Sequence, residues 1–195
     1  MLLTGPLERQ LGCGSRSSGG HTSEVAISGL NEPEAIQVSP VIRLRPFDPQ
    51  DIPDDQFQML LPCYQDRETV RMVDGPNAEP YDLDKLTAMF RYMSTHGELY
   101  LIELLTADGG WVAIGDAGLQ PSATPVVLSP EFRGRGIGRA VIKALIERAR
   151  VLGWQSVEVS EIYDYNVASR RTYESLGFVI VGDTELGHRY RLALS

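Results

Sequence analysis

One segment has the residue types and spacing of a phosphate-binding site. From Val126 to Gly138 the chain reads Val-Val-Leu-Ser-Pro-Glu-Phe-Arg-Gly-Arg-Gly-Ile-Gly, a short apolar strand followed by a proline, an arginine and three alternate glycines. Glycines let the backbone turn tightly with exposed N–H groups, and no Cβ blocks a ligand. The amphipathic helix that follows adds its unpaired first-turn N–H groups and the positive end of its dipole. The segment therefore predicts a site for the phosphate or pyrophosphate of a cofactor.

Two well-known phosphate loops do not fit this segment. A P-loop needs a lysine and then a serine or threonine after its last glycine, whereas an arginine and an alanine follow Gly138. A dinucleotide fingerprint needs glycine at its first, third and sixth positions. Counted from Gly134 the sixth position is Arg139, and counted from Gly136 it is Val141. The cofactor is therefore expected to belong to another class.

A second segment downstream has the features of a short capped helix. Asn166 is a good N-cap, because its side chain can accept hydrogen bonds from the free N–H groups of the next turn. Ser169 and Tyr173 are four residues apart and share one helix face. Gly177 suits the left-handed residue that ends a helix, and Phe178 begins an apolar strand. Taken alone, this segment indicates a capped helix with a buried tyrosine.

Together the two segments resemble the GCN5-related N-acetyltransferase (GNAT) superfamily. The first matches its Arg-x-x-Gly-x-Gly signature at Arg133, Gly136 and Gly138. The second matches a later family segment with an asparagine, a tyrosine seven residues on and a closing Leu-Gly-Phe. The resemblance covers residues 41–194 and is strongest over 126–178. It implies an α/β (α+β) fold, with a mixed, mostly antiparallel central sheet flanked by helices. It also implies direct transfer of the acetyl group of acetyl-CoA to a primary amine.

The resemblance also assigns residues to the cofactor. In the family, backbone groups of the strand before the loop hold the pantetheine, the loop wraps the pyrophosphate, and the later helix contacts the pantetheine arm or the adenosine phosphate. Acetyl-CoA is therefore expected at Val126, Leu128, Arg133, Gly134, Arg135, Gly136, Gly138, Arg139, Asn166, Ser169 and Tyr173. For Asn166, a role as a helix cap alone stays open.

The implied reaction needs a donor for the developing oxyanion, a proton for the leaving sulfur and a base for the amine. The backbone N–H of Leu128 is the expected donor. Tyr173 is the expected acid, because a phenol with an ordinary pKa of about 10 stays protonated at pH 7. A carboxylate could act as base through water. Glu161 is the first choice, and the alternatives are Glu103, Asp116, Glu158 or an amine that binds already neutral.

The elements that must position these groups follow from periodicity and turn residues. The expected strands cover residues 41–47, 98–106, 111–119, 126–129, 156–163, 178–181 and 189–194. Expected helices cover 82–93 and follow the glycine loop and Asn166. Residues 48–64 are expected as helical pieces, broken by Pro49, Pro53 and Pro62.

The strand over 156–163 departs from the family pattern. Val157 and Val159 lie on one face, but Ile162 falls on the other face together with Glu158 and Ser160. A bulge near Ser160 would correct the pattern, because one extra residue exchanges the two faces. The alternative is that Glu158, Ser160 or Glu161 points into a polar cleft.

Composition limits the class of protein. With 195 residues and 43% hydrophobic content, the chain can bury one core, which we expect over residues 41–195 after a flexible tail over 1–40. It lacks an apolar run long enough for a membrane helix. Its two cysteines, Cys13 and Cys63, have no zinc-ligand partners and favour a reducing cytoplasm. Neither a metal nor a membrane is therefore expected.

The charge distribution favours a small anion over a nucleic acid. The net charge is −8, yet residues 131–150 hold six basic and two acidic residues. A local basic patch suits a small polyanion, whereas a nucleic-acid duplex needs an extended basic surface. An RNA-associated protein and a non-catalytic acyl-CoA-binding regulatory module remain alternatives. The resemblance implies an amine acceptor, a small molecule or a peptide that the sequence does not identify, and a homodimer through strands near the C-terminus stays open.

Overall fold

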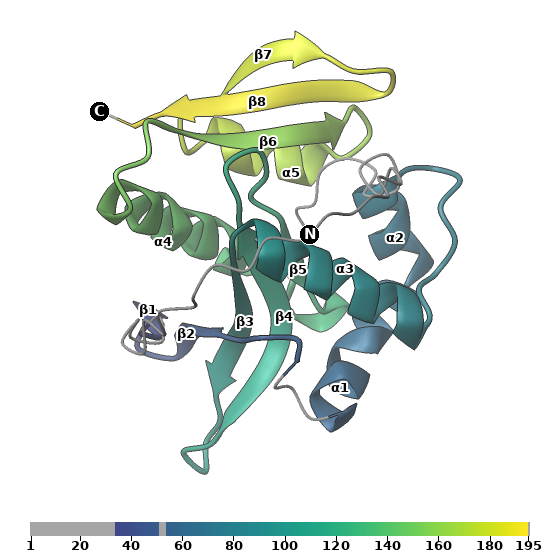
Figure 1. Ribbon diagram of the computed structural model, residues 1–195, viewed down its shortest axis with the longest axis vertical. Helices are drawn as coiled ribbons and strands as arrows, with labels where there is room; N and C mark the ends of the chain where they lie inside the picture. Colours follow the sequence, from purple (N-terminus) through teal and green to yellow (C-terminus); the bar gives the residue numbers. More distant parts are fainter. Residues whose placement is uncertain (1–33, 51–53, 195) are drawn as a thin grey trace, which may run out of the picture.

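The computed structural model describes residues 34–50 and 54–194, and these form two antiparallel sheets (Figure 1). The first has the strand order β1-β2-β3-β4-β5 and the second has the order β6-β8-β7. The strands of the first sheet are β1 (Ile36–Ser39), β2 (Ile42–Pro46), β3 (Glu98–Leu105), β4 (Trp111–Leu119) and β5 (Val126–Leu128). Those of the second are β6 (Ser156–Tyr163), β7 (Val179–Asp183) and β8 (Gly187–Ala193). The predicted α/β class with mostly antiparallel strands is confirmed.

The predicted boundary between tail and domain is too late by several residues. Strand β1 begins at Ile36 and pairs with β2, with Ile36 opposite Leu44. The folded part therefore starts before Val41, because Ile36 and Val38 add apolar side chains that pack on the core. The rest of the predicted tail lies outside the described residues.

Among the described residues, five α-helices flank the sheets, and side chains cap three of them. They are α1 (Asp54–Gln65), α2 (Arg67–Asp74), α3 (Leu83–His96), α4 (Ile137–Val151) and α5 (Val167–Glu174). Asp66, Asp82 and Asn166 cap α2, α3 and α5. The expected break at Pro62 is wrong, because α1 continues through this proline. The N–H of Asp66 still bonds to the Pro62 carbonyl, 3.2 Å away.

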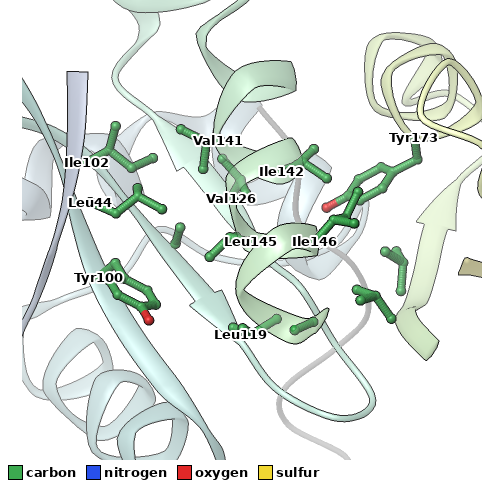
Figure 2. Close-up of a cluster of buried hydrophobic side chains, with 14 of the residues drawn as sticks. Leu44, Tyr100, Ile102, Leu119, Val126, Val141, Ile142, Leu145, Ile146 and Tyr173 are labelled. Atoms are coloured by element: carbon green, nitrogen blue, oxygen red, sulfur yellow. The ribbon is translucent and has the colours of Figure 1, made fainter. Parts of the chain in front are cut away.

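The two faces of the first sheet contact different helices. Helix α4 lies on one face, and α1 and α3 lie on the other (Figure 1). On the α4 face, Val126 and Leu128 of β5 join a core that continues into β6, β8 and α5. Figure 2 shows the side chains of α4 at its centre, facing strand residues such as Ile102 and Val126. On the opposite face, Val127 joins a second core built mainly from α1, α2 and α3. Strand β5 is therefore shared by both cores.

The bulge predicted in β6 is confirmed. Val159 lies opposite Tyr190 and Ile162 lies opposite His188, so three steps along β6 match two along β8. The extra residue brings Ile162 back to the face of Val157 and Val159, and all three belong to the α4 core. The inserted residue thus explains why the polarity pattern of the sequence switches within β6.

Candidate active site

Strand β5 ends the first sheet with a free edge that carries the predicted oxyanion donor. The Gly118 N–H donates to Pro125 O and the Ser129 N–H donates to Ile114 O, each over 2.9 Å. Because bonded pairs alternate in an antiparallel ladder, Val127 faces β4, and the N–H and C=O groups of Leu128 face away from it. No ladder joins β5 to β6 in the part of the chain that the structure describes. The Leu128 N–H is therefore directed towards the space beside the sheet edge.

The two sheets are joined at the start of β5. Thr124 Oγ1 donates to the carbonyl of Glu158 in β6 over 3.3 Å. The Tyr173 hydroxyl of α5 donates to the carbonyl of Thr124 over 2.6 Å. The strands of the two sheets run in different directions in Figure 1, so this junction connects them at one end of β5.

The glycine loop leaves the N-terminus of α4 open. Gly134 and Gly136 have φ values of 72° and 78°, in the left-handed region that favours glycine. A Cβ built at either position meets no atom within 4 Å, so the backbone is accessible there. Gly136 caps α4 without any side-chain hydrogen bond to the first turn. Gly138 is buried at the start of the helix, whereas Arg135 and Arg139 are exposed. Free N–H groups and exposed guanidinium groups are suited to a pyrophosphate, and Arg139 also donates to Ser175 Oγ over 3.0 Å.

Arg133 points away from this open turn and is held within the protein. Its Nε donates to the Leu128 carbonyl over 2.9 Å. One terminal nitrogen lies 3.4 Å from Asp66 Oδ2, and the other donates to Thr69 Oγ1. Every nitrogen of this guanidinium therefore has a protein partner, which the sequence-based assignment to the cofactor did not foresee.

The first turn of α5 holds one side chain with hydrogen-bond partners and one buried side chain without a partner among the described residues. The Asn166 carboxamide accepts from the Ser169 N–H over 3.2 Å and donates to the Met72 carbonyl over 3.5 Å. Asn166 thus acts as the expected cap and also contacts α2. Ser169 is completely buried, and its Oγ has no hydrogen-bond partner among the described residues. Such a group is costly unless a ligand or water satisfies it.

Tyr173 is completely buried in the α4 core. Its ring lies beside Ile142 and Ile146 in Figure 2 and packs edge-on against Phe178, with ring centroids 5.0 Å apart. Burial raises the pKa of its hydroxyl far above the usual value of 10. The group is therefore protonated at neutral pH, as the predicted acid requires, and its proton is directed at Thr124 O.

On the opposite face of the sheet, a buried acid of β4 lies beside β5. From the sequence, this acid is a predicted alternative to Glu161. Asp116 of β4 lies opposite Val127, is 1% exposed, and accepts from the Tyr64 hydroxyl at 2.9 Å on both oxygens. Burial raises the pKa of Asp116 to about 7, although the Tyr64 hydrogen bond opposes this rise. Burial and the neighbouring carboxylate also raise the pKa of Tyr64. Cys63 Sγ lies 3.0 Å from Ser129 Oγ at the end of β5.

Tyr64 is a partner of this acid that the sequence alone does not predict. A weak signal exists, since Asp116 interrupts the otherwise uncharged run Trp-Val-Ala-Ile-Gly-Asp-Ala-Gly-Leu. A carboxyl group in the middle of a strand buried on both faces requires a partner. That partner comes from a helix 52 residues earlier, which no local pattern connects to it.

The other proposed bases are engaged elsewhere. Glu103 accepts from Arg43 over 2.6 Å and from Arg45 over 2.7 Å. Glu158 accepts from Arg191 over 2.8 Å. Glu161 lies at the bulge, is 8% exposed, and accepts from the hydroxyl of Thr184, which follows β7.

Comparison with known proteins assigns the chain to a known family. The acetyltransferase (GNAT) domain family matches residues 42–179. The chain belongs to the GNAT family. The L-amino acid N-acyltransferase MnaT of Escherichia coli (strain K12) is 40% identical over 55 residues. That match covers 28% of this chain and 31% of MnaT, less than a third of the relative's length.

Solved acetyltransferase structures share the fold at low sequence identity. The Salmonella typhimurium acetyl transferase that modifies the N-terminal serine of ribosomal protein L7/L12 matches with a TM-score of 0.60 and 17% identity, covering 83% of this chain and 100% of that one. The yncA protein of Salmonella typhimurium, solved with its cofactor acetyl-CoA, matches with a TM-score of 0.55 and 20% identity. This match covers 79% of this chain and 94% of yncA. The predicted GNAT family and fold are confirmed.

The site of this GNAT chain fits acetyl-CoA on two structural grounds. The open loop and uncapped start of α4 suit the pyrophosphate. The unsatisfied Ser169 hydroxyl and the free edge of β5 offer donors and acceptors to an amide-bearing arm. Within residues 34–50 and 54–194, no helix is long and apolar enough to cross a membrane. No cluster of three or more potential metal ligands occurs among the same residues.

Proposed function

We propose that this chain is an acetyl-CoA-dependent N-acetyltransferase that transfers the acetyl group directly to a primary amine. The observation that carries the proposal is that two features follow each other along the chain. The Leu128 N–H faces away from β4 at the edge of β5, and the glycine loop then leads into a helix start without a side-chain cap. The two named relatives support this class, since one is an L-amino acid N-acyltransferase and the other modifies an N-terminal serine. A small-molecule or peptide amine is therefore the proposed acceptor.

The cofactor is proposed to run from the glycine loop along β5. Backbone N–H groups from Gly134 to Gly138 and the exposed Arg135 and Arg139 would hold the pyrophosphate. The outward-facing N–H and C=O of Val126 would hold the pantetheine amides, with Ser169 as an additional partner. Asn166 would shape this wall as a cap, because both ends of its carboxamide are already bonded.

Acetyl-CoA supplies the thioester, and the protein supplies charge stabilisation and proton transfer. The Leu128 N–H is proposed to donate to the acyl oxygen as negative charge develops, a contribution of about 3 kcal/mol in comparable sites. Tyr173 is proposed to hold the proton for the sulfur, which requires its hydroxyl to leave Thr124 O. We propose no acyl-enzyme, because Cys63 is buried and its raised pKa keeps the thiol protonated.

For the base, we now favour Asp116 over Glu161. A carboxyl group with a pKa of about 7 is half ionised at neutral pH, where it can both take up and release a proton. The Tyr64 hydroxyl donates to this carboxylate and retains a lone pair to accept a proton from the acceptor side. The amine proton would pass to Tyr64 as the Tyr64 proton passes to Asp116.

The first test is thermal stabilisation by acetyl-CoA, CoA and NAD⁺. A ligand at about a hundred times its Kd adds roughly 2.7 kcal/mol to the free energy of unfolding. We expect stabilisation by both CoA species, none by NAD⁺, and loss of the effect in Gly136→Asp, which puts a negative charge in the anion site. Gly153→Asp is the matched control, since Gly153 has a φ of 76° and equal open space at the other end of α4.

A positive result leads to a turnover screen. L-amino acids, a peptide with an N-terminal serine and a polyamine would be compared by release of free thiol from acetyl-CoA. Turnover with any of them supports the proposed function and names the acceptor class. Binding of CoA without turnover on any amine would favour the regulatory module, and no binding would overturn the proposal.

A further inference from the structure

Helix α2 is attached to the loops that follow β5 and β6. At its first turn, the Arg133 guanidinium joins three groups: the Leu128 carbonyl at 2.9 Å, the Asp66 carboxylate at 3.4 Å and the Thr69 hydroxyl. Thr69 is completely buried and also donates to Asp66. One side chain therefore connects the edge of β5 to the start of α2.

The end of α2 is attached to the segment after β6. The Tyr165 hydroxyl donates to the Arg71 carbonyl over 2.7 Å, and the Arg71 guanidinium lies 4.0 Å from the centre of the Tyr165 ring. Asn166 donates to Met72 O, and the Tyr163 hydroxyl lies 3.2 Å from the position of a Cβ on Gly75. Because both ends are attached, α2 has a defined position relative to both loops.

We propose that Arg133 is a positioning residue that clamps Leu128 to the first turn of α2, and that it does not bind the cofactor pyrophosphate. The inference rests on the proposed function, because Leu128 carries the proposed oxyanion donor. The N–H and C=O of Leu128 lie on the same edge of β5, so fixing the carbonyl also fixes the direction of the donor. A shift of about 1 Å in such a group is enough to reduce turnover strongly.

Charge balance supports this role. Burial opposes ionisation of Asp66, but hydrogen bonds from Thr69 and the nearby Arg133 outweigh it and lower the pKa of Asp66. The carboxylate is therefore charged at neutral pH and neutralises Arg133 locally. The neighbouring Arg135 is exposed, with its guanidinium 5.7 Å from the Phe132 ring centre, and we assign the phosphate contact to it. The two arginines of one loop thus have separate tasks.

The test compares Arg133→Gln with Arg135→Gln in the full chain. For Arg133→Gln we expect kcat to fall at least tenfold while the Kd for acetyl-CoA, measured by calorimetry, stays within twofold. For Arg135→Gln we expect the opposite division, a Kd raised several-fold and kcat within twofold. A Kd raised tenfold in Arg133→Gln with unchanged kcat would make Arg133 a pyrophosphate ligand and overturn the proposal.

A double-mutant cycle separates the clamp from a general loss of structure. Thr69→Val keeps the shape of the side chain but removes the hydroxyl that Arg133 reaches, and we expect kcat to fall about threefold. Added to Arg133→Gln it should cost nothing further, and additive losses would reject the clamp. Arg133→Lys keeps the charge without the three-way geometry and should not restore kcat.

Failure of the proposed function would look different. If the wild-type chain binds acetyl-CoA but turns over no amine, the proposed function falls. The clamp is then decided by thermal unfolding. Non-additive shifts in Tm for Arg133→Gln and Thr69→Val support it, and independent shifts reject it.

Discussion

The two faces of strand β5 differ in the groups that they offer to the proposed site. On the α4 face, Val126 and Leu128 pack among aliphatic side chains. The hydrogen-bonding groups on this side are the backbone groups of the free edge and of the glycine loop. On the opposite face, Val127 neighbours Asp116, which Tyr64 binds within a second core. Under the proposed assignments, cofactor binding depends on backbone geometry, whereas acceptor chemistry depends on a few buried side chains.

The largest effect is expected on the side-chain face, from Asp116→Asn. General-base catalysis contributes about 10²- to 10⁴-fold, so kcat/KM should fall at least a hundredfold with little change in the Kd for acetyl-CoA. In wild type, kcat/KM should rise with pH through about 7 as Asp116 ionises, and this limb should vanish in the variant. Ionisation of the amine itself appears in both proteins, so a limb lost only in the variant belongs to Asp116.

Glu161→Gln is the competing variant for the same measurement. We expect kcat/KM within about threefold of wild type, because this carboxylate is bonded to Thr184. A loss as large as that of Asp116→Asn would return the base to Glu161 and leave Tyr64 and Asp116 as a structural pair.

Asp116→Asn should also change how stability depends on pH. The pKa of Asp116 is raised from 3.8 to about 7 on folding, so the folded state favours the protonated form. Its contribution is fully present below about pH 4 and is lost as the pH rises through 7, by up to about 4 kcal/mol. We expect the variant to be more stable than wild type at pH 8 and to show a flatter profile in urea unfolding. A variant less stable at pH 8 would contradict this linkage.

The next effect tests whether Tyr173 belongs to the chemistry or only to the α4 core. Tyr173→Phe leaves the Thr124 carbonyl without its donor, which should cost about 1–3 kcal/mol of unfolding free energy. If Tyr173 is also the acid, kcat should fall at least tenfold at temperatures where the variant is fully folded. Tyr190→Phe is the control, since Tyr190 is equally buried and bonds to Glu174 away from β5. Equal losses of kcat in both variants would leave Tyr173 a structural role.

The smallest effect is expected from Ser169→Ala. If the unsatisfied hydroxyl binds the cofactor, the Kd for acetyl-CoA should rise about threefold to tenfold, the value of one hydrogen bond. Stability without ligand should stay equal or rise, because no protein hydrogen bond is lost. Thr172→Ala, on the same helix, should leave the Kd unchanged.

The two faces also differ in how far the sequence predicts them. The loop is predictable because its left-handed turns before a helix require glycine, and the sequence has glycine at positions 134 and 136. The β6 bulge is predictable for the same reason, from a polarity switch within eight residues. By contrast, Arg133 reaches Thr69 across 64 residues of sequence, and only the folded arrangement of α2 shows that this arginine is occupied.

The remaining errors have physical causes of the same kind. Pro62 is tolerated inside α1, where neighbouring hydrogen bonds and packing keep the helix continuous. Strand β1 is short, and its assignment depends on pairing with β2, which no local pattern reveals. Local patterns therefore define elements and turns, while tertiary partners decide which polar groups stay available.

The buried acid of β4 also affects how this protein would respond to selection. A search for heat-resistant variants at neutral or alkaline pH would find replacements of Asp116 early, because each removes a carboxylate from an apolar interior. If Asp116 is the base, those variants would survive heating and fail at turnover. A library screened for melting temperature alone would therefore accumulate inactive proteins. A library screened for thiol release would keep this aspartate, although its burial lowers the free energy of unfolding.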